Sequence, residues 1–256
     1  DILVETGTLV GLGYTAFVLG SYTEARAWFT ESIGLSRARG ATYFLAMSES
    51  MLALVAQAEG AGDALTLAQA GLEDSRLLGY SHHGLTTGLW ALSCILHAQG
   101  KLVEAHEAAR EALQLSVELQ HLWARGTAKL QLGAIALAQG DAVTAQDLVQ
   151  ESVNIFTELG EPWSLGRALV ARGWVAQAQH QHNEARSWFE QALNKARALQ
   201  LDPIACSAQY GLAYLIQEEA PAAALVFLEQ VINHQATERT IRDRAIELRQ
   251  ALIAAE

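Results

Sequence analysis

The sequence predicts an all-α protein, an α-solenoid of about six helix-turn-helix repeats followed by a C-terminal closing helix. Similar segments recur at intervals of forty residues, each around a break in the helical pattern, which is usually a glycine. No segment shows the strict alternation of apolar and polar residues that is typical of a strand. The recurring glycines are Gly20, Gly60, Gly100 and Gly140, and the most similar segments are 12–32, 132–152 and 172–192.

Each repeat is predicted to contain two helices. In the first repeat Leu12, Ala16 and Leu19 recur at helical spacing, Gly20 interrupts the pattern, and a second apolar stripe follows from Ala25. Glycine adopts the left-handed conformation that ends many helices without the steric cost of a Cβ atom. The glycine positions are therefore predicted helix ends.

Start signals for helices support the same division. Ser21 with Glu24 fits a capping box, and Asp141 is a good N-cap residue. The only three prolines stand where first helical turns are expected, and none interrupts a helix. These prolines are Pro162, Pro203 and Pro221.

The forty-residue period divides the chain into six repeats and a tail. The predicted repeats are 1–40, 41–79, 80–120, 121–160, 161–200 and 201–236, and the closing helix is 237–256. The tail is rich in charged residues, which suits the solvated end of a solenoid. Because Asp1 lies inside a helical pattern with neither a start methionine nor a cap, we expect the chain to belong to a longer protein. We expect an elongated, curved rod.

The charge balance argues against several classes of partner. The formal net charge is −11, whereas binding to a phosphate backbone depends on clustered Lys and Arg. The same charge disfavours an anionic membrane surface, and no apolar run has the length that spans a bilayer. We therefore predict no contact of this domain with nucleic acid or with a membrane.

Patterns of catalytic or metal-binding residues are missing from the sequence. Cys94 and Cys206 lie three repeats apart, too far for a disulfide, which predicts reduced thiols and a cytoplasmic location. Cys94 and His97 share a helix face, but no second pair of metal ligands accompanies them. No Ser-His-Asp spacing, catalytic carboxylate pair or phosphate-binding glycine loop occurs. The sequence predicts neither an enzyme nor a cofactor.

The repeats share a motif: Leu-Gly-x-x-Ala, a Gly seven residues after the first Gly, Ala five later, an aromatic four later, and Ala or Ser three later. The first repeat has Leu12, Gly13, Gly20, Ala25, Phe29 and Ser32, the fourth has Leu132, Gly133, Ala136, Gly140, Ala145 and Ser152, and the fifth has Gly173, Ala176, Ala185, Phe189 and Ala192. This pattern resembles the tetratricopeptide repeat over residues 1–236. The usual repeat has about 34 residues and a closing proline, and this sequence departs from both.

The resemblance implies a right-handed superhelix in which the first helix of each repeat lines the concave surface. The longer, forty-residue form resembles the repeat domains of large bacterial signal-transduction ATPases, the LuxR-type ATP-binding regulators that include the maltose-regulon activator. In that class the repeat domain senses an inducer or a partner. No P-loop or DNA-binding motif occurs in the sequence itself.

Aromatic residues gather on the first-helix stripe that the resemblance places on the concave surface. His97 lies on the same stripe, and Arg167 is its only Lys or Arg. Large rigid aromatics supply binding area, and one cation among them can anchor a carboxylate or phosphate. We predict a ligand-binding or partner-binding site here. Its aromatic members are Trp90, Trp123, Trp163, Trp174, Tyr210 and Tyr214.

An alternative interpretation stays open for the four tryptophans of this stripe. Trp123 and Trp163 stand near helix starts, where an aromatic side chain can simply cover the junction between two repeats. Trp90 and Trp174 lie further along their helices, but the same structural role applies to them.

These observations predict a non-catalytic sensor or interaction module of a cytosolic bacterial regulatory protein, which binds through its concave groove. The predicted partner is a protein or peptide segment, or an apolar or aromatic small molecule, with an acidic group facing Arg167. The alternative is a scaffold or oligomerisation array that contacts sister chains or neighbouring domains.

Overall fold

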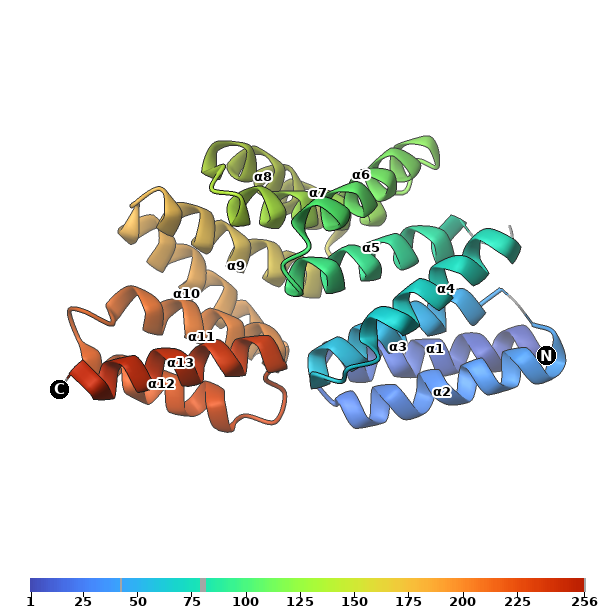
Figure 1. Ribbon diagram of the computed structural model, residues 1–256, viewed down its shortest axis with the longest axis horizontal. Helices are drawn as coiled ribbons and strands as arrows, with labels where there is room; N and C mark the ends of the chain where they lie inside the picture. Colours follow the sequence, from blue (N-terminus) through green and yellow to red (C-terminus); the bar gives the residue numbers. More distant parts are fainter. Residues whose placement is uncertain (42, 79–81, 256) are drawn as a thin grey trace.

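The computed structural model describes residues 1–41, 43–78 and 82–255, and all regular structure within these ranges is α-helical. The predicted all-α repeat solenoid is confirmed (Figure 1). The thirteen helices of the described residues are α1 (Ile2–Val18), α2 (Tyr22–Arg39), α3 (Leu45–Glu59), α4 (Ala64–Leu78), α5 (His82–Ala98), α6 (Leu102–Glu118), α7 (Leu122–Ala138), α8 (Ala142–Leu159), α9 (Pro162–Ala178), α10 (His182–Ala198), α11 (Asp202–Ile216), α12 (Pro221–Asn233) and α13 (Arg239–Ala255).

The helices form two layers. Every helix packs against the next one in the chain, and each odd-numbered helix also contacts the following odd-numbered helix. Helices on the inner side of a curved array lie closer together than those on the outer side. The odd-numbered helices α1 to α13 therefore form the inner layer.

Left-handed residues end several helices, as the glycine period predicts. The four predicted glycines, Gly20, Gly60, Gly100 and Gly140, all have positive φ angles of 75–84° just after a helix, and Gly40 and Gly160 end α2 and α8 in the same conformation. The side chain of Asp141 accepts a hydrogen bond of 3.0 Å from the backbone N–H of Thr144, which confirms the predicted N-cap. The capping box predicted at Ser21 is wrong, because the Ser21 side chain makes no capping hydrogen bond.

The core depends on a close approach between the two helices of a repeat. Phe189 of α10 is fully buried, and a Cβ atom on Gly173 of α9 would lie 2.5 Å from its ring. Only glycine leaves room for that ring. The same pair recurs in the first repeat, where Gly13 faces the buried Phe29. The Gly and Phe positions of the repeat motif are thus one packing unit.

The solenoid curls until its first repeat meets its C-terminal part, and Figure 1 shows the right-hand end of α13 beside α3. The Tyr22 hydroxyl donates a buried hydrogen bond of 3.2 Å to the carbonyl oxygen of Ala236. On the inner side, the ring centroids of Phe17 and Trp163 lie 5.7 Å apart. We call the contact between α1–α3 and residues 234–242 the seam. The expectation of an elongated rod is wrong, because the period contains no information about whether the curved array meets itself.

The tail packs as a further inner helix. Leu248 and Leu252 of α13 pack against a cluster that contains the buried Leu228 and Val231 of α12. Arg242 fixes the turn before α13 by donating hydrogen bonds to the carbonyl oxygen of His234 at 2.8 Å and to that of Ile232 at 3.2 Å. The helix therefore covers the apolar edge of the last repeat and supplies residues to the seam.

Gly20 offers a test of the seam. Its φ angle is +81°, and a Cβ atom would collide with Ala236 across the seam. We expect Gly20→Ala to lower stability by about 1 kcal/mol from backbone strain and by a further 1–3 kcal/mol, roughly, from the collision.

Gly100→Ala is the matched control for this change. Gly100 has a φ angle of +75° at the same point of its repeat, but nothing lies within 4 Å of its added Cβ atom. Thermal unfolding should show the larger loss for Gly20→Ala, and small-angle X-ray scattering should show a larger radius of gyration for that variant alone. Equal behaviour of both variants would contradict the seam.

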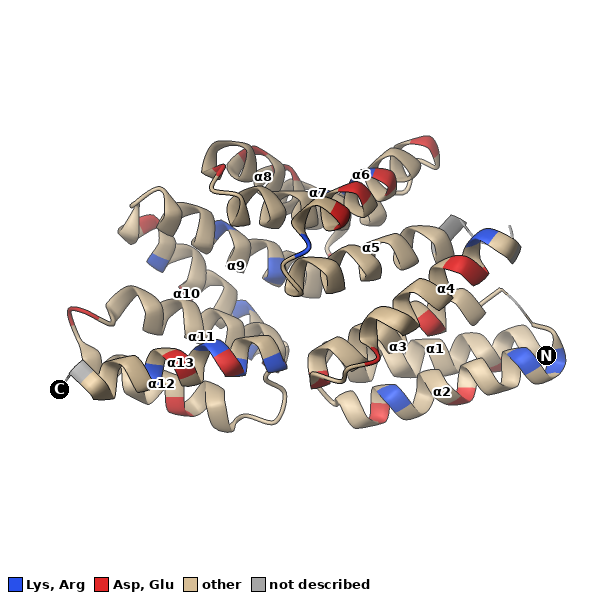
Figure 2. Ribbon diagram, viewed as in Figure 1, with Lys and Arg blue, Asp and Glu red and all other residues tan. Residues whose placement is uncertain are grey.

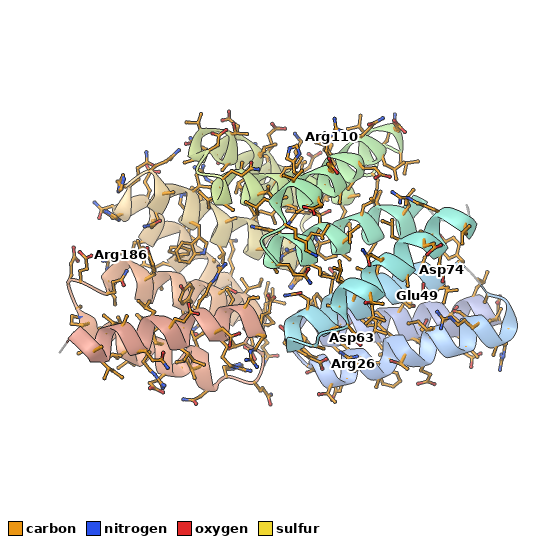
Figure 3. All side chains as sticks on the ribbon, viewed as in Figure 1. Arg26, Glu49, Asp63, Asp74, Arg110 and Arg186 are labelled. Atoms are coloured by element: carbon orange, nitrogen blue, oxygen red, sulfur yellow. The ribbon has the colours of Figure 1, made fainter. Side chains whose placement is uncertain are left out.

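Glu49 is the clearest buried charge of the inner layer. It is 4% exposed, its Oε1 accepts a hydrogen bond of 2.6 Å from Arg37 Nη2, and its Oε2 is buried without a partner. Burial raises the pKa of Glu49 to about 7, Asp74 adds to this, and Arg37 opposes it. Figure 3 labels Glu49 on α3 and Asp74 on α4.

The folded state therefore binds the Glu49 proton more tightly than the unfolded chain, whose pKa is near 4.5. The stability contributed by protonated Glu49 is complete below pH 4.5 and is lost as the pH rises to about 7. We expect the unfolding free energy of the wild type to fall relative to Glu49→Gln by on the order of 3 kcal/mol across this window. Urea unfolding on both sides of the window measures it, with the exposed Glu31→Gln as control. A constant difference would contradict the burial effect.

Candidate functional site

The inner layer contains a cavity of about 580 Å³ between α7, α9 and α11. His97 of α5, Arg244 of α13 and Val149 of α8 complete its lining, so five inner helices and one outer helix contribute to it. We call it the inner cavity. Four residues that the sequence analysis selected meet there: His97, Trp174, Tyr210 and Tyr214.

Aromatic rings form one wall of the inner cavity. The ring centroid of Trp174 lies 5.6 Å from that of Tyr210 and 5.4 Å from that of Tyr214. Phe189 packs against Trp174, with their ring centroids 5.2 Å apart and an angle of 71° between the ring planes. Because Phe189 belongs to the packing unit of the fifth repeat, the wall is fixed to the core. Its partly exposed rings, Trp174 and Tyr214, can contact a ligand.

Small and apolar side chains form much of the remaining lining. α7 supplies Ala134 and Leu137, and α9 supplies Ala171 and Ala178. No Lys, Arg, Asp or Glu occurs in α5, and Figure 2 shows this helix without charge colours. The cavity is therefore suited to an apolar or aromatic group.

Arg244 is the permanent charge of the inner cavity. It is the only Lys, Arg, Asp or Glu among the described lining residues, and its side chain is exposed. Burial lowers the pKa of His97, and the nearby Arg244 lowers it further. Burial raises the pKa of Tyr210, although Arg244 opposes this. At neutral pH the cavity thus presents the neutral imidazole of His97 and the phenol of Tyr210 beside Arg244.

Sequence reasoning missed Arg244. The charge of the tail indicated a solvated closing helix, and this is correct for much of α13. The period does not say which face of a closing helix turns inward, so nothing in the sequence separated Arg244 from the other arginines of the tail.

The other predicted site residues form a second group, which we call the Arg167 cluster: Trp90, Trp123, Trp163 and Arg167. The guanidinium carbon of Arg167 lies 4.8 Å from the ring centroid of Trp163 and 5.4 Å from that of Trp90. The two indoles meet edge to face at 6.2 Å, and Trp123 lies 5.5 Å from Trp90. Arg167 is thus held by cation–π contacts with rings from α5 and α9.

Two indoles of this cluster are buried. Trp90 is 3% exposed and Trp163 is 5% exposed. The physical reason is the curl of the solenoid, which places Phe17 and Tyr14 of α1 against Trp163. These rings therefore face the interior in this conformation, whereas Trp174 and Tyr214 line open space.

Several other features of the described chain give no sign of chemistry. Cys94 and Cys206 are free thiols. Within the described ranges, no group of three His, Cys, Asp or Glu side chains is placed to hold a metal ion. None of the helices described combines the length and apolar character that a membrane span requires.

The pKa of His97 provides a test of the cavity geometry. We expect a value below 6.5, because burial and Arg244 both favour the neutral imidazole. Arg244→Gln removes one of these causes and should raise the His97 pKa, as measured by an NMR titration of the imidazole. Arg249→Gln is the control, since Arg249 lies on the same helix but pairs with Glu229 at 2.9 Å. If both variants shift the pKa equally, Arg244 does not face His97.

Comparison with known proteins gives a family match for part of the chain. Residues 125–198, which contain most of α7 to α10, match the family model described as Tetratricopeptide repeat. A search of curated protein sequences gave no significant match.

Solved structures agree over a larger part of the chain. BtubC (BKLC) from P. vanneervenii is 21% identical, with 91% of this chain and 92% of that chain covered and a TM-score of 0.59. The Rap conjugation gene regulator of the plasmid pLS20, solved in complex with the Phr* peptide, is 14% identical. The match covers 100% of this chain and 76% of the Rap regulator, with a TM-score of 0.72. At these identities the likeness concerns the fold.

Proposed function

We propose that this chain is a non-catalytic binding module that recognises a peptide or a protein segment through its inner cavity. The observation that carries the proposal is the aromatic wall of Trp174, Tyr210 and Tyr214 around an open space of about 580 Å³, with Arg244 at its edge. Apolar pockets of about 300–1,000 Å³ with a few placed polar groups are typical of ligand sites.

The cavity suits a side chain of a peptide. An aromatic or aliphatic side chain fits among the rings, and an acidic group of the same segment is attracted to Arg244. The Rap regulator supports this proposal, since it shares the fold and was solved with a peptide. The small-molecule partner that the sequence also suggested has no such support, and we do not propose it.

The wider role follows from the same comparison and from the repeat length. A repeat module with an inner ligand cavity is suited to a regulatory protein, in which a bound peptide alters the contacts of other domains. We propose a cytosolic bacterial regulator, as the forty-residue form of the repeat suggests. The LuxR-type regulators are one class with this architecture.

One observation favours the alternative, an array that contacts sister chains. Val4 and Leu12 of α1 are 66% and 43% exposed, whereas Leu132 and Leu212, which correspond to Leu12, are each 7% exposed. In later repeats this face packs on the preceding even-numbered helix. The face of α1 that carries Val4 and Leu12 is therefore available to pack against another helix, independently of the inner cavity.

Peptide selection tests the proposed function. We expect peptides selected on the wild-type protein from a random displayed library to lose at least about tenfold in affinity towards Trp174→Ala, because a central aromatic anchor contributes about 2 kcal/mol or more. The control is Trp188→Ala on α10, whose ring stacks on Arg172 away from the cavity lining. Isothermal titration calorimetry on folded variants measures both.

Two outcomes would contradict this function. One is a library that yields no binder, and the other is a set of binders that tolerate Trp174→Ala but not Trp188→Ala. The second outcome would move the site to the even-numbered layer.

A further inference from the structure

Two hydrogen-bond donors of the Arg167 cluster are unused. Arg167 Nη1 and Trp90 Nε1 are buried, and neither has a hydrogen-bond partner among the described residues. Buried donors are nearly always paired, because leaving one unpaired costs stability. Two such donors from α5 and α9, one of them charged, indicate that an acceptor is missing from this position.

The Cys94 sulfur lies close enough to Arg167 and Trp90 for both to lower the pKa of this thiol, but a thiol is a weak acceptor and neither donor reaches it with hydrogen-bond geometry. The Cys94 thiol donates to Gln131 Oε1 at 3.4 Å, and burial raises the pKa of Cys94 to about 11, although Arg167 opposes this. Cys94 therefore stays neutral. The carboxylate of Glu161 accepts the backbone N–H groups of Trp163 and Ser164 at 3.2 Å and 2.7 Å, so it serves as the cap of α9.

Glu238 is the remaining carboxylate that interacts electrostatically with Arg167. Burial raises the pKa of Glu238, and Arg167 opposes this. Within the described chain, Glu238 forms neither an ion pair nor a hydrogen bond with Arg167 Nη1. Glu238 therefore does not satisfy this donor.

We propose that the Arg167 cluster is the carboxylate-binding position of the peptide site. The incoming carboxylate accepts one hydrogen bond from Arg167 Nη1 and one from Trp90 Nε1. The indole faces of Trp90 and Trp163 hold the guanidinium plane in place, so that little side-chain freedom is lost on binding. This inference rests on the proposed function, because the same peptide also occupies the inner cavity.

The distance between the two positions follows from helix geometry. On α5, His97 at the cavity lies seven residues after Trp90, and on α9, Trp174 lies seven residues after Arg167. Seven helical residues rise by about 10 Å. Because Arg167 contacts Trp90, and His97 and Trp174 line one cavity, the two helices run in the same direction here. Ala171, one turn after Arg167, lines the cavity between them.

An extended peptide covers about 10 Å with three residues. The bound segment therefore carries an acidic group about three residues away from the aromatic or aliphatic residue in the inner cavity. The acidic group can be a side chain or a chain terminus, since both present a carboxylate.

Synthetic peptides provide the test with the whole chain as it stands. The probes are acetylated, amidated peptides with one tryptophan and one glutamate separated by increasing numbers of alanines, and their glutamine twins. A second series ends in a free carboxylate in place of the glutamate. We expect binding to peak at a separation of about three residues, with glutamate preferred over glutamine by about tenfold or more.

The variants separate Arg167 from a general charge effect. Arg167→Met should abolish the preference for glutamate and leave the affinity for the glutamine twin nearly unchanged. Arg172→Met is the matched control, because Arg172 lies on the same helix and also stacks on a tryptophan, at 5.3 Å from Trp188. Trp90→Phe keeps an aromatic ring but removes the N–H donor, so it should reduce the preference for glutamate over glutamine. Because it preserves the packing, this variant should fold even if Arg167→Met does not.

A spectroscopic measurement is independent of the affinities. The indole N–H resonance of Trp90 should shift with the glutamate peptide and hardly with its glutamine twin.

Equal binding of the two twin peptides to the wild type, or a preference for glutamate that persists in both Arg167→Met and Trp90→Phe, would overturn the proposal. If library peptides depend on Trp174 but no acidic peptide is preferred, the carboxylate position fails and the proposed function stands. If Trp174 has no effect on any peptide, the proposed function fails as well.

Discussion

The close contact between the two helices of a repeat, made at a small residue of the first helix, is the interaction on which this structure depends. The residue is Gly13, Gly133 or Gly173 in three repeats and the buried Ala53, Ser93 or Ala213 in the other three. Where Gly173 faces Phe189, two helices approach to a distance that no side chain at the glycine would permit. The same contact is made by Gly13 and Phe29 in the first repeat. Because each repeat buries its neighbour in a similar way, a small rotation accumulates along the chain. The solenoid curls, and α5, α9 and α13 come within reach of one another.

The sequence predicted the features that depend on one repeat and its neighbour. Helical spacing, the glycine stops and the Asp141 cap are local, and they follow from the conformational preferences of single residues. The inner wall was also predictable in part, because the motif indicates which helix of each repeat faces inward. Trp174, Tyr210, Tyr214 and His97 do meet at one cavity.

The remaining features depend on contacts between repeats that lie far apart in sequence. Burial of Trp90 and Trp163 requires α1 to reach α9, which depends on the summed curvature of all repeats and not on any one of them. The role of Arg244 depends on the rotation of α13, which the repeat motif of residues 1–236 does not determine.

Both the seam and the inner cavity include residues of α13, so ligand binding in the cavity is coupled to closure of the arc. Arg242 and Ala236 hold the start of this helix at the seam, and two residues after Arg242 the side chain of Arg244 lines the inner cavity. A ligand that contacts Arg244 and the aromatic wall therefore joins α13 to α9 and α11, and His97 brings α5 into the same site. If such a ligand binds the closed arc more tightly than an open one, it stabilises closure by that difference in affinity and no more.

The acidic surface of the chain makes the site more selective for where an acidic segment binds. With a net charge of −11, the chain repels acidic segments in general, so they are retained only where Arg244 and the desolvated Arg167 present a local positive charge.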